Sequence, residues 1–251
     1  MRRLIVGLAA FSLAAGALTG CASAQGAGGA ASSVVSAALA DAARPAADTS
    51  RDAKRKPAEM IAFAGIKPGS KVVDYLPGGG YFTRVFSKVV GPTGKVYAVS
   101  PPGRDNAPPA VAAIAAAPGY GNIQVVPIAT MAYGATPEKV DVVWTSRNYH
   151  DLHARNLDLA AINKAVFDSL KPGGIYIVLD HAALTTTGLD TPGQLHRINP
   201  DIVKKEVLAA GFQFVAEDNT LRNPQDDVTK RVFEEGIPDS SDQFIYKFRK
   251  P

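Results

Sequence analysis

The chain has 251 residues, of which 46% are hydrophobic and 20% are charged, and its formal net charge is +4. This length accommodates one large domain or two small ones, and the composition excludes a collagen, a coiled coil and a mainly disordered chain. The single cysteine excludes a disulfide framework and a metal site built from several cysteines, and the mild charge without a long basic block gives no reason to expect nucleic acid as a partner.

The start of the chain has the pattern of an export signal. Two arginines at residues 2–3 precede an apolar run over residues 4–18, which is too short for a comfortable membrane span. The letters LTGC, which end at Cys21, then resemble a bacterial lipobox, in which the cysteine is lipidated and becomes the mature N-terminus. We therefore predict a signal peptide over residues 1–20. The rival cleavage, after Ala24, would release a soluble protein.

These features predict an exported protein, periplasmic or anchored to the outer membrane of a bacterium. A lipid on Cys21 would be its only membrane contact, without a transmembrane helix. Residues 21–56 are rich in Ala, Gly and Ser, so we predict a flexible tether there, in which residues 34–43 before Pro45 can form a short helix. A short basic run at 51–56 is interpreted as a solvated face. The folded domain is expected to cover residues 57–251.

From residue 57 onward, apolar and β-branched runs alternate with stretches of helical spacing. The apolar runs predict strands at 71–76, 95–99, 123–128, 140–145, 175–180, 212–217 and 243–248. The stretches between them predict helices at 57–64, 81–90, 107–117, 157–170 and 201–210. This alternation predicts an α/β fold with a doubly wound, mostly parallel seven-stranded sheet.

A glycine turn stands between the first predicted strand and its helix. The letters PGGG at residues 77–80 allow a close backbone approach, so that a ligand can lie against the free N–H groups of the helix N-terminus. In such sheets ligands bind outside the carboxyl ends of the strands, near the point where the strand order reverses. Alone, the turn is a weak signal, because any tight strand-to-helix connection uses similar residues.

This segment resembles motif I of class I S-adenosylmethionine-dependent methyltransferases, and the later LKPGG at residues 170–174 resembles one of their strand entries. The final order of helix, strand, long connection and strand also resembles their C-terminal arrangement. More narrowly, the chain resembles the bacterial exported proteins called predicted methyltransferases, in the segments PGGGYFTR (77–84), RNYHDLH (147–153), LDHAA (179–183), LHRI (195–198) and DQFIYKFRKP (242–251). The resemblance covers about residues 57–251 and implies a Rossmann-like class I methyltransferase architecture.

The resemblance implies that the cofactor is S-adenosylmethionine. Asp74 matches the acidic residue of motif I, and Gly78 and Gly80 match two of its glycines. Two positions depart from the pattern: Leu76 stands where the family usually has its first glycine, and Ser100 stands where an acidic residue usually holds the ribose hydroxyls. The cofactor-binding residues expected from the resemblance are Asp74, Gly78, Gly79, Gly80 and Ser100.

All four histidines follow predicted strands, so they can meet at one edge of a parallel sheet. An imidazole near its ordinary pKa suits general base catalysis. We predict His150 as the base that takes the proton of the methyl acceptor, with Asp151 or His181 orienting it. The residues expected to bind a small polar substrate are Asn148, Tyr149, His153, His196 and Arg197.

The favoured interpretation is a methyltransferase that acts on an unidentified small polar acceptor. Because S-adenosylmethionine is made in the cytosol, export leaves two alternatives open: a similar scaffold that binds another ligand or a metal through its His/Asp edge, and a lipid-anchored binding protein without catalysis. In the metal version His150 and His153 share one ion, with His181 as a third ligand. No specific metalloenzyme signature is present, so the favoured interpretation assigns no metal.

Overall fold

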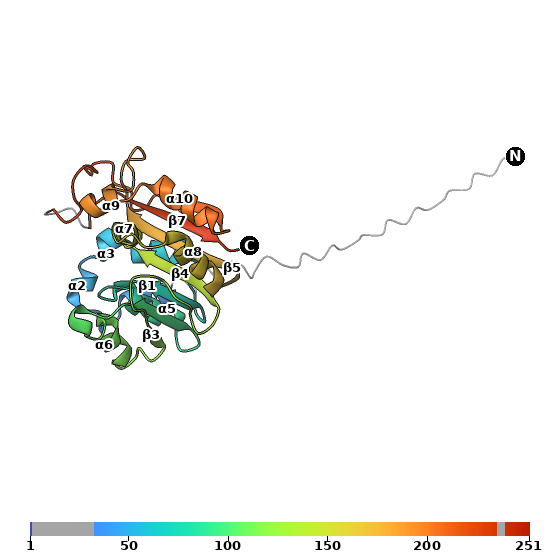
Figure 1. Cartoon of the computed structure of the whole chain (residues 1–251). Helices are drawn as coiled ribbons and strands as arrows, with labels where there is room; N and C mark the ends of the chain where they lie inside the picture. Colours follow the sequence, from blue (N-terminus) through green and yellow to red (C-terminus); the bar gives the residue numbers. More distant parts are fainter. Residues whose placement is uncertain (2–32, 235–238) are drawn as a thin grey trace.

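A seven-stranded sheet forms the centre of the protein in a computed structural model that describes residues 1, 33–234 and 239–251 (Figure 1). The strands are β1 (Lys71–Tyr75), β2 (Lys95–Ser100), β3 (Ile123–Pro127), β4 (Val140–Ser146), β5 (Leu170–His181), β6 (Gln213–Asp218) and β7 (Gln243–Arg249). Their order across the sheet is β3-β2-β1-β4-β5-β7-β6. All pairs from β3 to β5 are parallel, and β7 is antiparallel to both β5 and β6. The predicted α/β fold with a mostly parallel seven-stranded sheet is therefore confirmed.

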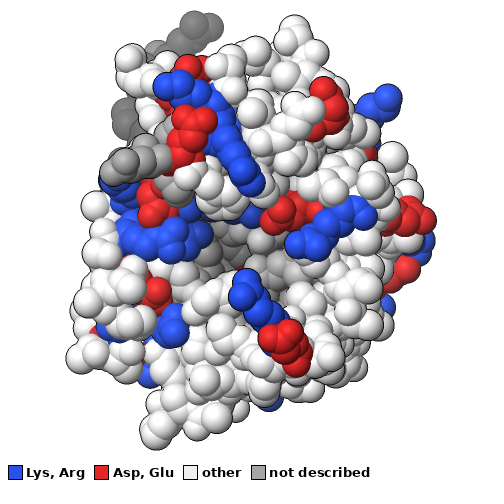
Figure 2. Space-filling model, turned by 60° about the vertical axis from the view of Figure 1, so that its left-hand side comes forward, with Lys and Arg blue, Asp and Glu red and all other residues white. Residues whose placement is uncertain are grey.

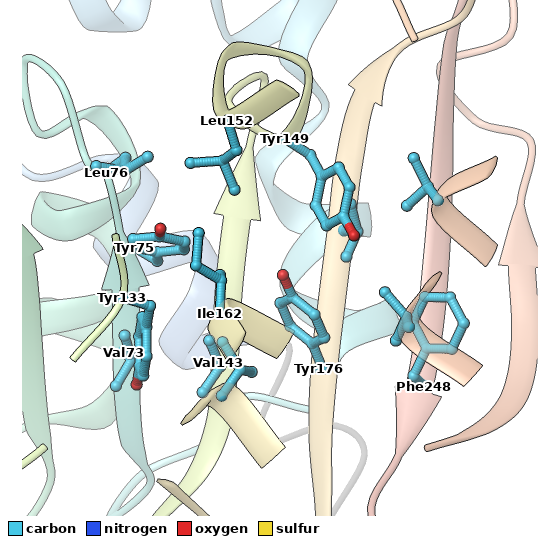
Figure 3. Packing of buried hydrophobic residues seen from close by; sticks show 14 of the residues in the cluster. Val73, Tyr75, Leu76, Tyr133, Val143, Tyr149, Leu152, Ile162, Tyr176 and Phe248 are labelled. Atoms are coloured by element: carbon cyan, nitrogen blue, oxygen red, sulfur yellow. The ribbon is translucent and has the colours of Figure 1, made fainter. Parts of the chain in front are cut away.

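Successive side chains of each strand point to opposite faces of the sheet, and each face belongs to its own apolar cluster. One apolar cluster contains Val73, Tyr75, Val143 and Tyr176, which Figure 3 shows pointing to the same side of the sheet. The helices α8 (Leu159–Ser169) and α10 (Pro200–Ala209) cover this face. On the opposite face the helices that complete a second cluster are α4 (Pro57–Ala64), α5 (Tyr81–Val90) and α6 (Ala110–Ala116).

The structure differs from the predicted elements in a few places. Helix α6 begins at Ala110 rather than at 107, because two prolines at 108 and 109 precede it and Pro109 is its N-cap. Strand β5 starts at Leu170 and includes the PGG segment that was expected to precede it. The short elements that the sequence does not reveal are α7 (Tyr149–Ala154), α9 (Thr191–Leu195) and the 3-10 turn η1 (Arg104–Asn106).

The predicted tether over residues 21–56 is wrong for its described part, which packs on the domain. Residues 33–39 are helical, and Ala38 belongs to the apolar cluster that also contains α5. Two further short helices follow, α2 (Ala46–Thr49) and α3 (Asp52–Arg55). The Arg44 guanidinium donates to both carboxylate oxygens of Asp52, at 2.7 and 2.6 Å, and one of these oxygens also accepts the Tyr81 hydroxyl of α5. These contacts dock the segment beside the carboxyl end of β1.

The predicted signal peptide, Cys21 and the first part of the predicted tether lie outside the described residues, apart from Met1. Among the residues that the structure does describe, none belongs to a helix with the length and apolar character that a membrane crossing requires.

Candidate active site

A cavity of about 300 Å³ lies at the point where the strand order reverses, between the carboxyl ends of β1 and β4. This is the place where sheets of this kind bind ligands. Figure 2 is turned toward the side that carries α2 and α3, and it shows basic side chains on both sides of a hollow. A larger hollow of about 540 Å³, at the amino ends of β2 and β3, has no histidine or carboxylate in its lining. The cavity between β1 and β4 is therefore the candidate active site.

The turn after β1 forms one wall of this cavity. Leu76 has φ +58°, a left-handed conformation that bulky residues rarely adopt, and Gly78 has φ +55°. A methyl group on Gly78 or Gly79 would meet nothing within 4 Å, so this stretch of backbone is open to the cavity. Although Leu76 stands where the motif that this segment resembles has its first glycine, its backbone keeps a conformation typical of glycine, and its carbonyl accepts the Asn148 side-chain amide at 3.0 Å.

Other predicted cofactor residues do not line the cavity. A side chain on Gly80 would collide with Ile114 of α6, so Gly80 is a packing position. Asp74 is buried on the α5 side of β1 and accepts the Thr83 hydroxyl at 2.6 Å. Burial raises the pKa of Asp74 to about 6, although the Thr83 hydrogen bond opposes the shift. The Ser100 hydroxyl, at the end of β2, donates to the neighbouring carbonyl of Pro101.

The wall opposite the glycine turn carries a buried His–Asp pair. Nδ1 of His150 lies 2.8 Å from Oδ1 of Asp180, and the His150 backbone N–H donates to Oδ2 at 2.8 Å. Burial alone would lower the pKa of His150, but the charge and hydrogen bond of Asp180 outweigh it and the pKa is raised. Nε2 of His150 is buried and has no hydrogen-bond partner among the described residues.

Two more predicted residues lie beside this pair. Oδ1 of Asp151 is 3.5 Å from Nε2 of His150 and 3.7 Å from Nδ1 of His196. His181 follows Asp180 on β5, lines the cavity and shares a 2.7 Å hydrogen bond with the Ser241 hydroxyl. Burial lowers the pKa of His181 to about 3, so this imidazole is neutral near pH 7. The structure thus brings His150, Asp151, His181 and His196 together, as the sequence predicts.

Three of the predicted substrate residues serve other contacts. The Tyr149 hydroxyl and Nε2 of His153 both contact Oε2 of Glu206 on α10, at 2.9 and 3.0 Å. The alternative in which His150, His153 and His181 share one metal ion does not fit this arrangement, because Nε2 of His153 pairs with Glu206 instead. Arg197 is fully buried and pairs with Asp226 at 2.7 Å, which ties the connection after β6 to the domain.

The cavity is also lined by three arginines that are not among the predicted site residues. Arg51 and Arg147 share the carboxylate of Asp239, with oxygen contacts of 2.7 Å each. Arg55 is only 8% exposed and, within the described chain, has neither a hydrogen bond nor an ion pair; its guanidinium lies over the Tyr81 ring, 4.2 Å from the centroid. Burial, together with the charges of Arg147 and Arg51, lowers the pKa of Arg55 to about 9. Arg51 and Arg55 are four residues apart, which is the spacing of one helical face. This spacing within the basic run at 51–56 is the sequence signal that could have identified the two arginines.

No family model and no curated protein matches this chain. Solved structures do match it. A SAM-dependent methyltransferase from Aquifex aeolicus has a TM-score of 0.55 at 17% identity, over 78% of this chain and 89% of that one. The glycopeptide N-methyltransferase MtfA, solved with S-adenosylmethionine, has a TM-score of 0.52 at 15% identity, over 78% and 87%. A "possible exported protein" from Bordetella parapertussis has a TM-score of 0.54 at 12% identity, over 80% and 68%.

The chain has the fold of S-adenosylmethionine-dependent methyltransferases. At these identities the likeness concerns the fold alone, so the fit of the cofactor depends on this chain's own residues. In this chain the same cavity is lined by the open backbone of Gly78 and Gly79 and by Arg55, which has no ion-pair partner among the described residues. A ligand carboxylate would give the buried Arg55 guanidinium the counter-charge that it lacks. The last residue of β2 is Ser100 rather than a residue with a carboxylate, so the fit depends on the glycine turn and Arg55.

Proposed function

We propose that this protein is an S-adenosylmethionine-dependent methyltransferase that acts on a small polar acceptor. The observation that carries the proposal is the convergence of three groups on one cavity: the open glycine backbone, the Arg55 guanidinium and Nε2 of His150. Bound S-adenosylmethionine would supply a methyl group on a sulfonium. Methyl transfer depends mainly on in-line positioning of the methyl group and the acceptor.

The residues of the cavity have separate roles in this proposal. The backbone at Gly78 and Gly79 and the guanidinium of Arg55 hold the cofactor. Nε2 of His150 accepts the proton of the acceptor, while the Asp180 carboxylate accepts Nδ1–H and stabilises the imidazolium that forms. Asn148 positions the turn, because its amide donates to the carbonyl of Leu76.

Calorimetry on the purified full-length chain tests the cofactor. We expect one molecule of S-adenosylmethionine or S-adenosylhomocysteine to bind per chain. A Gly79→Val variant is expected to lose this binding, because the added side chain enters the cavity, while Gly121→Ala, at the distant hollow, keeps it. No heat of binding at millimolar ligand would contradict the proposal.

We also propose that the protein is exported and anchored through a lipid on Cys21, as the LTGC pattern predicts. The expected result is that the wild type sediments with membranes and that Cys21→Ser does not. A wild type found in the soluble periplasmic fraction would instead support cleavage after Ala24, and one found in the cytosol would contradict export. An exported methyltransferase also requires a supply of S-adenosylmethionine outside the cytosol.

A further inference from the structure

Three side-chain atoms converge at the edge of the cavity. Nε2 of His150, Oδ1 of Asp151 and Nδ1 of His196 all lie within 4.8 Å of one another, and the carboxylate oxygen is 3.5 and 3.7 Å from the two nitrogens. Bonds of about 2.0–2.2 Å from one ion to nitrogen or oxygen ligands place those ligands roughly 3–3.5 Å apart. We propose that these three residues bind one divalent transition-metal ion.

The two imidazole nitrogens have no other partner. Both are buried, and neither has a hydrogen bond within the part of the chain that the structure describes. Buried polar atoms in proteins are nearly always paired, so two orphaned nitrogens aimed at one carboxylate call for an explanation. Two histidines and one carboxylate form a donor set that suits Zn²⁺, Fe²⁺ or Mn²⁺ and leaves coordination positions open.

The surroundings of His150 favour its role as a ligand. Because Nδ1 bonds the Asp180 carboxylate at 2.8 Å, Nδ1 carries the hydrogen of the neutral ring and the lone pair is on Nε2. A carboxylate behind a ligating histidine is the usual support of metal sites, since it fixes the tautomer and makes the ligand more basic. Asp180 is itself fully buried and also accepts the His181 backbone N–H, so its own position is fixed.

His196 must change its tautomer to join the site. Nη2 of Arg231 lies 3.0 Å from Nε2 of His196, and because arginine only donates, Nε2 accepts there and Nδ1 carries the hydrogen. Metal binding moves that hydrogen to Nε2 without a net gain or loss of protons, and the exposed Arg231 side chain turns away. Arg231 therefore opposes the ion, and its removal is expected to tighten binding.

The open positions of the ion face the candidate active site, because His150 and Asp151 both line the cavity. A hydroxyl or water bound there would lose its proton more readily, as on other metal ions. In the metal-bound protein the ion thus replaces Nε2 of His150 as the group that promotes proton loss. The inference goes beyond the proposed methyl transfer, since metal binding stands whether or not S-adenosylmethionine binds.

Metal titration of the full-length chain, treated with chelator and free of any affinity tag, tests the site. We expect one Zn²⁺ per chain by calorimetry, with micromolar or tighter affinity, and visible absorption bands when Co²⁺ replaces it. Asp151→Asn and His196→Ala should each weaken Zn²⁺ binding at least tenfold, and Arg231→Ala should strengthen it. The matched control is His153→Gln, on the same helix but paired with Glu206, which should bind as the wild type does.

His150 is buried and ion-paired, so its replacement can unfold the chain; the partly exposed Asp151 and His196 carry the test instead. Thermal melting confirms that each variant is folded. The proposal is overturned if Zn²⁺ binds only at millimolar concentration, if several weak ions bind per chain, or if Asp151→Asn and His196→Ala bind Zn²⁺ as tightly as the wild type. A chain that binds Zn²⁺ but not S-adenosylhomocysteine would support the metal site and contradict the methyltransferase proposal.

Discussion

The Asp180 carboxylate holds the His150 imidazole by two hydrogen bonds, one to Nδ1 and one to the backbone N–H, each of 2.8 Å. Asp180 stands near the end of β5, whereas His150 stands at the start of α7, just after β4. Because β4 and β5 are parallel neighbours, their carboxyl ends bring the two residues together. The pair fixes the His150 ring at the wall of the cavity and leaves Nε2 without a hydrogen bond among the described residues, whether this atom takes a proton or binds an ion.

Replacement of Asp180 by Asn should lower the pKa of His150. Burial lowers this pKa, whereas the charge and hydrogen bond of Asp180 and the charge of Asp151 raise it, so loss of the two Asp180 contributions should lower the pKa. NMR titration of the His150 ring in metal-free protein measures the change, with His153 as the internal reference. An unchanged or higher pKa in the variant would show that Asp180 does not control this ring.

The neutral, buried His181 should make stability depend on pH. Burial lowers its pKa to about 3 in the folded chain, whereas the unfolded chain titrates near 6.5. As the pH falls below 6.5 the unfolded chain binds a proton that the folded chain does not, so stability is lost. Between pH 7 and pH 4 the wild type should lose roughly 3 kcal/mol more than His181→Asn in urea unfolding. Equal losses in the two proteins would refute this origin of the pH dependence.

The strands and the glycine turn could be predicted from the sequence because their signals are local. The run KVVDYL at residues 71–76 is β-branched and apolar, and the following PGGG marks a turn into a helix. The edge where His150 and His181 meet also follows from the alternation, since parallel strands present their carboxyl ends on one side. These features need no knowledge of which distant residues pair.

What the sequence does not reveal depends on contacts between distant segments. His150 and His153 lie three residues apart on α7, yet one faces Asp180 of β5 and the other faces Glu206 of α10. The composition of residues 33–56 is typical of a linker. This segment packs on the domain through contacts such as that of Asp52 with Tyr81, which is 29 residues away. Hydrophobic periodicity does not predict such contacts.

Arg55 should be required for ligands that carry a carboxylate. Its buried guanidinium lacks an anionic partner in the described chain, so Arg55→Met should weaken S-adenosylhomocysteine binding by about tenfold to a hundredfold, as loss of a hydrogen bond to a charged group does. Binding of 5′-methylthioadenosine, which has no carboxylate, should not change. Stability should stay equal or rise, because an unpaired buried charge is removed. Equal losses for both ligands would place Arg55 outside the carboxylate site.

Two neighbouring glycines should separate stability from binding. A methyl group on Gly80 would lie 2.3 Å from Cδ1 of Ile114, and Gly80 has φ +80°, so Gly80→Ala should destabilise the fold by about 1–3 kcal/mol in urea unfolding. A methyl group on Gly79 meets nothing within 4 Å, so Gly79→Ala should change stability by less than about 0.5 kcal/mol. The same methyl group enters the cavity, so calorimetry should show weaker S-adenosylhomocysteine binding to Gly79→Ala. If Gly79→Ala binds as the wild type does, the ligand does not lie against the turn, and the cofactor assignment loses its main support.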